Sequence, residues 1–215
     1  MYATAQSSTH RSANPGLAGL ASRPAQSWPR RIELLAADTE IYAQGERSGT
    51  LYHIEFGAVR VYRLLADGRR QVVAFHLAGE TFGFEADRSR SFFAETTVET
   101  GLRMMEPGDY DQCAPELMAA ALRGMVRAQE HLLVVGRQSA VEKLAVFLLD
   151  LAKRQGDNDQ IDLPMTRNDI GDYLGMTIET VSRNLSRLRD DGILRLRSSR
   201  CIEVLQPERL RKLCQ

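Results

Sequence analysis

Hydrophobic positions in the first half of the chain follow a strand-like pattern. Between residues 32 and 107, short apolar or alternating runs are separated by glycine-containing turns at intervals of roughly 8–12 residues, which is typical of an antiparallel sandwich or barrel. Residues 61–65 and 71–75 are two such runs, and an Asp67-Gly68 pair lies between them. We expect a hairpin here, because Asp-Gly supplies the positive φ angles that its turn needs.

The period changes to a helical one after Pro107. Residues 115–137 contain good helix formers, and six positions recur at alternating steps of four and three residues. This heptad seam consists of Met118, Leu122, Met125, Gln129, Leu132 and Gly136. Such a seam either pairs with a second copy of the chain or packs on the chain's own β domain. The spacing favours a homodimer, with the polar Gln129 fixing the register. A second helix is expected over residues 141–155, followed by a polar loop over residues 157–162.

The segment from Thr166 to Leu188 combines two short amphipathic helices. Thr166 and Thr177 can each cap a helix, and Gly175 interrupts the first one. The apolar faces that we expect to be buried are Ile170, Tyr173 and Leu174 in the first helix and Ile178, Val181, Leu185 and Leu188 in the second. Two such helices joined by a glycine-containing turn make a helix-turn-helix, whose second helix enters the major groove of DNA.

The opposite face of the second helix carries side chains that can contact DNA bases. Arginine matches guanine O6 and N7, glutamate accepts from cytosine N4, and serine bonds to either kind of base edge. Glu179, Ser182 and Arg183 lie one helical turn apart and are the predicted base contacts, which we call the recognition triplet. Phosphate contacts, which orient the protein without specifying sequence, are expected from Thr166, Arg167, Thr177, Ser186 and Arg187.

The pattern after the helix-turn-helix predicts a small wing. Residues 193–196 and 201–205 alternate like two strands on either side of residues 198–200. A short closing helix is expected from Pro207 to Leu213.

The distribution of charge is more informative than the total, which is formally zero over 215 residues. Residues 178–200 contain six arginines and three acids, whereas residues 34–138 contain 11 arginines and 15 acids. A basic C-terminal stretch fits nucleic-acid binding. No nucleophile–base pair, metal motif or phosphate loop indicates an enzyme. Because the chain lacks a signal-peptide core and a run of about 20 apolar residues, we expect a cytoplasmic protein with no membrane partner.

Three cysteines, Cys113, Cys201 and Cys214, do not form a disulfide framework or a Cys-x2-Cys metal pair. Cys201 follows Arg200 and lies within reach of Arg197. Nearby cations lower the pKa of a thiol and raise its reactivity. Redox regulation at Cys201 is therefore one interpretation, and a plain structural cysteine is the other.

The stretch from Leu163 to Arg183, with its Glu179-x-x-Ser182-Arg183 triplet, resembles the CRP/FNR superfamily of bacterial regulators and is most similar to the FixK branch. The glycine-containing segments at 57–60, 67–71 and 79–83 look like the family's β-roll. The resemblance covers about residues 32–213. It implies an α+β fold with an antiparallel, cyclic-nucleotide-binding-like β-roll, a long dimerisation helix and a C-terminal winged helix-turn-helix.

This resemblance also implies boundaries and partners. We expect a mobile tail over residues 1–31 that includes Trp28, a β-roll effector-like domain over 32–112, a dimerisation helix over 113–138 and a DNA-binding domain over 139–215. The implied partners are double-stranded DNA, a second copy of the chain and RNA polymerase. The implied DNA site is a palindrome similar to TTGAT-N4-ATCAA, and the implied targets are low-oxygen, nitrogen-fixation or respiratory genes.

The sequence departs from the family pattern at positions that would bind a cyclic nucleotide. Cyclic-nucleotide binders place an arginine and a serine or threonine where this chain has Phe92-Phe93-Ala94-Glu95, and a carboxylate there repels phosphate. Glu80 and Gly83 are then turn residues, unless Arg88 or Arg90 takes the phosphate-binding role.

The residues that would hold a cofactor can be examined in the same way. The chain has no cysteine before Cys113, so we expect no oxygen-sensing iron–sulfur cluster. The expectation is a regulator without an obligatory small ligand or cofactor. The alternative is a regulator that senses a metabolite or haem in the β-roll, with His53, His76 and His131 as the available histidines, although a lone histidine is more often structural.

Overall fold

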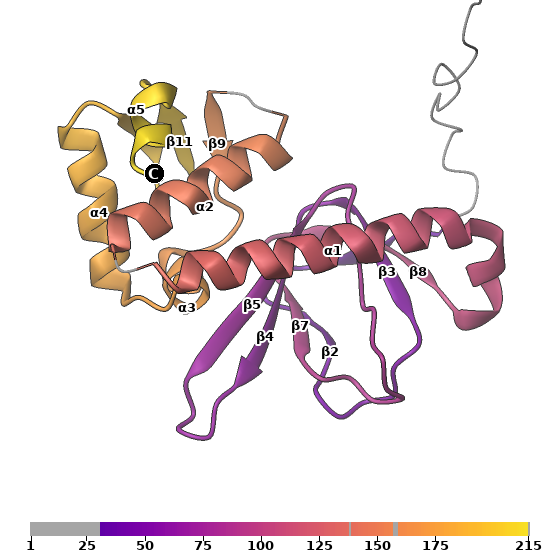
Figure 1. Ribbon diagram of the computed structural model, residues 1–215. Coiled ribbons are helices and arrows are strands. Elements are labelled where there is room, and N and C mark those ends of the chain that lie inside the picture. The colour runs from indigo at the N-terminus through magenta and orange to yellow at the C-terminus, as the bar shows by residue number, and fades with distance from the viewer. Residues whose placement is uncertain (1–30, 138, 157–158, 215) are drawn as a thin grey trace, which may run out of the picture.

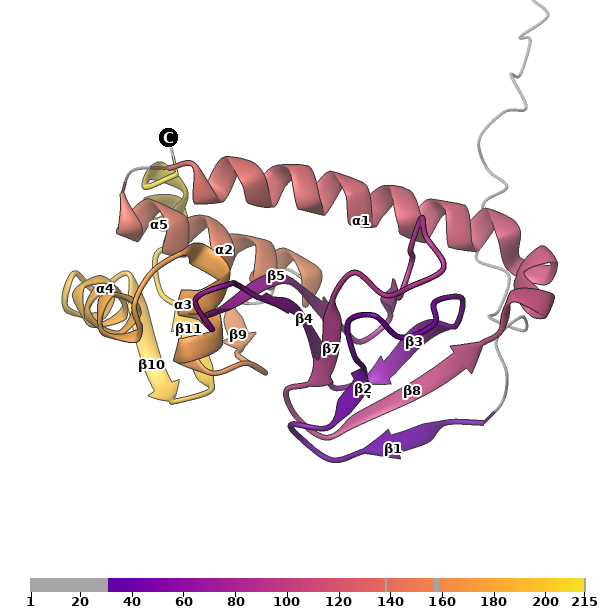
Figure 2. The ribbon, with the colours of Figure 1, turned by 90° about the horizontal axis from the view of Figure 1, so that it is seen from below.

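The structure, a computed structural model, describes residues 31–137, 139–156 and 159–214 of the chain (Figure 1). A β domain and a C-terminal domain are joined by one long helix, α1, which runs along both of them (Figure 2). The predicted tail over residues 1–31, with Trp28, lies outside the described residues except for Arg31.

Eight strands make up the β domain. They are β1 (Glu33–Leu35), β2 (Glu40–Tyr42), β3 (Leu51–Phe56), β4 (Ala58–Leu64), β5 (Arg70–Leu77), β6 (Thr81–Phe82), β7 (Phe93–Thr96) and β8 (Thr100–Met105). These strands form two antiparallel four-stranded sheets, in the orders β1-β8-β3-β6 and β2-β7-β4-β5. Ile54 from one sheet and Val59 and Ala94 from the other are fully buried between them. The predicted antiparallel β domain is confirmed.

The predicted hairpin is formed by β4 and β5, in which Val61 pairs with Ala74. Only Gly68 in its turn has a positive φ angle, of 82°. Asp67 does not share that conformation; its carboxylate accepts a hydrogen bond from the backbone N–H of Arg69 (3.0 Å). The expectation of positive φ at both turn residues was therefore wrong for Asp67, whose side chain stabilises the turn instead.

A short 3-10 helix and two α-helices follow the β domain. A 3-10 helix, η1 (Pro107–Cys113), leads into α1 (Ala114–Val135), and α2 (Ala140–Arg154) begins after a short turn. Leu117, Ala120 and Val134 are the buried residues of α1. Both predicted helices are confirmed, whereas the domain boundaries proposed above remain an interpretation.

The C-terminal domain contains β9 (Gln160–Asp162), α3 (Arg167–Leu174), α4 (Ile178–Asp190), β10 (Leu194–Ser198), β11 (Cys201–Val204) and α5 (Pro207–Lys212). The wing strands β10 and β11 and the closing helix are as predicted. Residues 160–162 were wrongly expected to be loop: they form β9, which pairs with β11 in a sheet of order β10-β11-β9. Only Ile161 is buried there, and one apolar residue in a polar segment has no detectable period.

Aromatic rings connect the two domains at the contact between α3 and β5. The Tyr173 ring lies 5.2 Å from that of Phe75 and 3.8 Å from that of His131, centroid to centroid. The helix-turn-helix is thus seated on the β domain and on α1 at the same point.

Candidate nucleic-acid interface

Caps at both helix starts define the helix-turn-helix. The Thr166 hydroxyl accepts from the Asp169 backbone N–H (3.1 Å), and the Asp169 carboxylate accepts from the Thr166 backbone N–H (2.9 Å), which completes a capping box at the start of α3. The Thr177 hydroxyl accepts from the Thr180 backbone N–H (3.3 Å) at the start of α4. Both predicted caps are confirmed, and Gly175 ends α3 in the left-handed conformation.

Gly171 has a role that the sequence did not reveal. A Cβ atom at this position would lie 2.6 Å from the carbonyl oxygen of Met176, in the turn between the two helices. Because real Cβ atoms do not approach an oxygen so closely, only glycine fits here. The contact joins residues five apart through a turn, so no helical or strand period reports it.

Burial leaves one side of α4 free for a partner. Val181, Leu185 and Leu188 are buried, as predicted. Ile178 was wrongly expected to join them, since it is 41% exposed. It is the first residue of α4, between the exposed Thr177 and Glu179, so the first turn lies outside the core that the rest of the helix enters.

The recognition triplet lies on this free side. Glu179 and Arg183 are exposed and Ser182 is half-buried. The pKa of Glu179 is lowered by its own backbone N–H, the Thr177 hydroxyl and Arg183. Its carboxylate is therefore ionised at neutral pH and suited to accept from a cytosine amino group.

The predicted phosphate contacts surround the triplet on two helices. Arg167, the first residue of α3, donates through Nη1 to Ser182 Oγ (3.3 Å), so it joins the start of one helix to the middle of the other. Thr166, Thr177 and Arg187 are exposed, whereas Arg167 and Ser186 are half-buried. Thr166 and Thr177 already use their hydroxyls as caps, yet each begins a helix at the surface. Phosphate binding by these five residues remains a prediction.

The heptad seam lies on the exposed side of α1. All six of its residues are exposed in the single chain, and Leu132 is 72% exposed. Val126 and Leu133, which the spacing did not include, widen the same apolar stripe. The side of α1 that faces its own chain carries Leu117, Ala120 and Val134 instead. Packing of the seam on the chain's own β domain is thereby contradicted.

Known families match both domains. Residues 32–110 match the cyclic nucleotide-binding domain, and residues 142–213 match the Crp-like helix-turn-helix domain. The nitrogen fixation regulation protein FixK of Rhizobium meliloti (strain 1021) is 53% identical over 188 residues, which cover 87% of this chain and 89% of that protein. The chain belongs to the CRP/FNR family of transcription regulators.

Further members of this family agree in sequence and in fold. FixK of Azorhizobium caulinodans is 38% identical over 192 residues, which cover 84% of this chain and 77% of that protein. The structure of FixK2 from Bradyrhizobium japonicum superposes with a TM-score of 0.81 at 39% identity, covering 86% of this chain and 97% of that one. The chain is therefore a FixK-like DNA-binding regulator and not an enzyme.

Arg90 is the residue of the β domain that could take the phosphate-binding role in this CRP/FNR regulator. Arg90 is buried and donates to the carbonyl oxygens of Gly83 and Thr50, at 2.6 Å each, while its guanidinium lies over the Tyr42 ring. Both terminal nitrogens of its guanidinium are thus directed at the protein backbone. The alternative in which Arg90 takes the phosphate-binding role is not favoured by this arrangement.

Glu80 was wrongly expected to be a turn residue only. Its carboxylate accepts from Arg154 of α2 (3.0 Å) and lies 3.5 Å from Arg127 of α1, so it connects three elements. Burial alone would raise the pKa of Glu80, but His76, whose Nδ1 lies 3.5 Å from the carboxylate, and the charges of Arg154 and Arg127 lower it to about 2. Glu80 is thus a structural ion-pair residue. Its arginine partners lie too far along the chain for a sequence pattern to reveal the contact.

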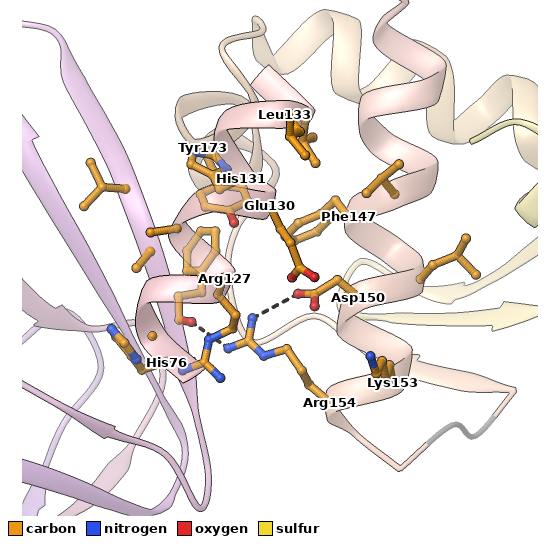
Figure 3. Close-up of a pocket in the computed structure, with 18 of the residues that line it drawn as sticks. His76, Arg127, Glu130, His131, Leu133, Phe147, Asp150, Lys153, Arg154 and Tyr173 are labelled. Atoms are coloured by element: carbon orange, nitrogen blue, oxygen red, sulfur yellow. Dashed lines mark hydrogen bonds and ion pairs between the residues drawn. The ribbon is translucent and has the colours of Figure 1, made fainter. Parts of the chain in front are cut away.

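A cavity of about 460 Å³ lies between β5, α1 and α2, outside the core between the two sheets (Figure 3). Aromatic rings of Phe147 and Tyr173 line it together with charged side chains, and Arg154 donates to Asp150 (3.2 Å) and to the carbonyl oxygen of Phe75 (2.6 Å). The cavity is therefore part of the junction between the two domains.

The three histidines of the described residues have packing contacts within the chain. His53 bonds to the Thr81 hydroxyl (3.2 Å), His76 stacks on Phe82 and His131 stacks on Tyr173. Among residues 31–137, 139–156 and 159–214, no group of three or more potential metal ligands is found. Over the same residues, no helix combines the length and apolarity needed to cross a bilayer.

Cys201 lies in a different electrostatic environment from the expected one. Burial raises the pKa of its thiol, and Asp162 raises it further, whereas Arg197 has a smaller opposing effect. The expected lowering was wrong because the unforeseen strand β9 places Asp162 directly opposite Cys201. Redox regulation at Cys201 has no support from thiol acidity.

Proposed function

We propose that this regulator is a homodimeric activator that binds a TTGAT-N4-ATCAA-like palindrome with one α4 helix in each half-site. The free, charged face of α4 carries the proposal: Glu179 and Arg183 point away from the core and suit cytosine and guanine edges. The exposed seam on α1 supports a two-fold dimer, and a two-fold dimer matches a palindrome.

The β domain bears on whether the regulator needs a bound small molecule as its signal. Phe92 and Phe93 stand where the family's cyclic-nucleotide binders have phosphate contacts, and Arg90 is bonded to backbone carbonyls. We infer that DNA binding requires no small ligand or haem. By similarity to FixK proteins, the target genes are those of nitrogen fixation or low-oxygen respiration. The regulator acts in the cytoplasm of a bacterium, and the complex that starts transcription includes RNA polymerase.

Substitution of one base-contacting residue tests the assignment. Arg183→Ala should weaken binding to the palindrome by about 1–3 kcal/mol per half-site and abolish discrimination at the guanine. The matched control is Arg189→Ala, which removes the same charge from the exposed end of α4. Fluorescence anisotropy with purified protein and no added ligand would measure both. Unchanged guanine discrimination in Arg183→Ala would refute the base contact, and binding that appears only after a nucleotide or haem is added would refute ligand independence.

A further inference from the structure

A buried ion cluster joins the β domain to the helix-turn-helix. Asp169 of α3 is 1% exposed and lies 3.2 Å from Arg60 Nη1 and 2.5 Å from Arg70 Nη2. Arg70 also contacts the Asp172 carboxylate, with Nε donating at 2.9 Å. We call Arg60, Arg70, Asp169 and Asp172 the Asp169 cluster.

Both ends of the cluster are held rigidly. On the β side, the 8%-exposed Arg60 is fixed by ion pairs to Glu95 (2.9 Å) and Asp38 (3.0 Å). On the helical side, Asp169 is the capping-box residue of α3, and the Gln71 amide donates to the Asp172 carbonyl oxygen (2.6 Å). A change in the angle between β5 and α3 would therefore break several charge-assisted bonds together.

The other connections of α3 at this junction constrain the direction of the helix less. The chain passes from α1 to α2 through a short turn, and Tyr173 of α3 makes ring contacts with Phe75 and His131. The ion pair of Arg154 with Glu80 holds α2, not α3, to the β domain. Apolar contacts tolerate small rotations, whereas charge-assisted hydrogen bonds from one guanidinium to two carboxylates demand a defined geometry. The Asp169 cluster is thus the set of ion pairs that joins α3 itself to the β domain, and we assign to it the angle of α3 and with it that of α4.

That angle matters because α1 fixes the β domains about the two-fold axis, while α4 must reach a groove on each side. One additional base pair between half-sites moves the second one by about 3.4 Å and rotates it by roughly 35° around the DNA. A dimer with rigidly held helix-turn-helix units can satisfy only one such spacing.

We propose that Arg60 and Arg70 are positioning residues that, through Asp169 and Asp172, select the number of base pairs between the two half-sites. This inference rests on the proposed palindromic function. It assigns spacing selectivity to residues that do not touch DNA, separate from the base selectivity of the recognition triplet.

The test uses Arg70→Met in the full chain, because Arg70 is less buried than Arg60 and its loss is better tolerated. Arg69→Met is the matched control: it removes the same charge from the neighbouring residue, whose carboxylate partner is Asp67 in the hairpin turn. Binding would be measured by anisotropy on duplexes with three, four, five or six base pairs between TTGAT and ATCAA. A further duplex carries a substituted guanine in one half-site.

Wild type and Arg69→Met should prefer their best spacing over the next by about tenfold or more, the value of one lost base contact. Arg70→Met should reduce this preference to within about threefold, while guanine discrimination changes by less than about twofold. A second variant, Arg70→Lys, keeps a cation beside Asp169 and Asp172 and should have a spacing preference between those of wild type and Arg70→Met.

Two results would overturn the inference. One is an Arg70→Met variant with the spacing preference of wild type. The other is a parallel loss of spacing and guanine preference in both Arg70→Met and Arg70→Lys, since this indicates a merely structural contact. A wild-type protein that does not bind TTGAT half-sites at all would instead refute the proposed function, and the inference with it.

Discussion

Replacement of Gly171 by alanine tests the geometry of the helix-turn-helix most directly. The added Cβ would lie 2.6 Å from the Met176 carbonyl oxygen, a backbone atom that a rotamer change cannot move. Restoring an ordinary contact requires a displacement of more than half an ångström, and over-packing of this kind costs about 1–3 kcal/mol. Alanine recovers about 1 kcal/mol of helix propensity, so we expect a net loss of up to about 2 kcal/mol.

The matched control is Gly124→Ala, because Gly124 also lies inside a helix but a Cβ there meets nothing within 4 Å. That variant should be more stable than wild type by up to about 1 kcal/mol. Thermal unfolding followed by circular dichroism would separate the two, since 1 kcal/mol corresponds to about 2–4 °C in a chain of this size. A Gly171→Ala protein as stable as Gly124→Ala would refute the claim that the turn packs against α3 this tightly.

Two further predictions concern α1 and its ion pairs. Leu132→Glu should convert a dimer to a folded monomer, because it charges the apolar seam without disturbing the monomer core; sedimentation that still shows a dimer would contradict the seam. Glu80, with its pKa lowered to about 2, stabilises the fold above its unfolded pKa near 4.5 and loses that contribution as the pH falls toward 2. Glu80→Gln should therefore be less stable than wild type at pH 6 by on the order of 3 kcal/mol in urea unfolding, with the difference closing near pH 2; a constant difference would contradict the ion-pair role.

Local signals in the sequence predicted the candidate interface well. Thr166, Gly175 and Thr177 mark helix ends through their own backbone preferences, and the apolar period of α4 defines its buried side, so the free side could be deduced without a structure. Gly68 marked the turn of the β4–β5 hairpin in the same way, although Asp67 did not adopt the positive φ angle expected of it. In each case, the residues that determine the element lie within a few positions of one another.

Features that depend on residues far apart in the chain were not predictable. Glu80 meets Arg154 across 74 positions, and Asp169 meets Arg60 across 109. Charged residues of this kind look like ordinary surface residues in a sequence, since no period distinguishes a solvated arginine from one bound to a distant carboxylate. Strand β9 was missed on the same grounds, and its absence led to the wrong direction for the pKa of Cys201.

Asp169 shows why the two kinds of information must be combined. Its position three residues after Thr166 identifies a capping residue, and that role alone accounts for an acid at this site. A capping carboxylate at a surface helix needs no further partner, yet this one is almost fully buried between two arginines of the β domain. Removing a carboxylate from water is costly unless the site provides such partners, so the burial implies a constraint beyond capping. In the complex that we propose, that constraint is the orientation of α3, and through it the placement of α4 and its recognition triplet on DNA.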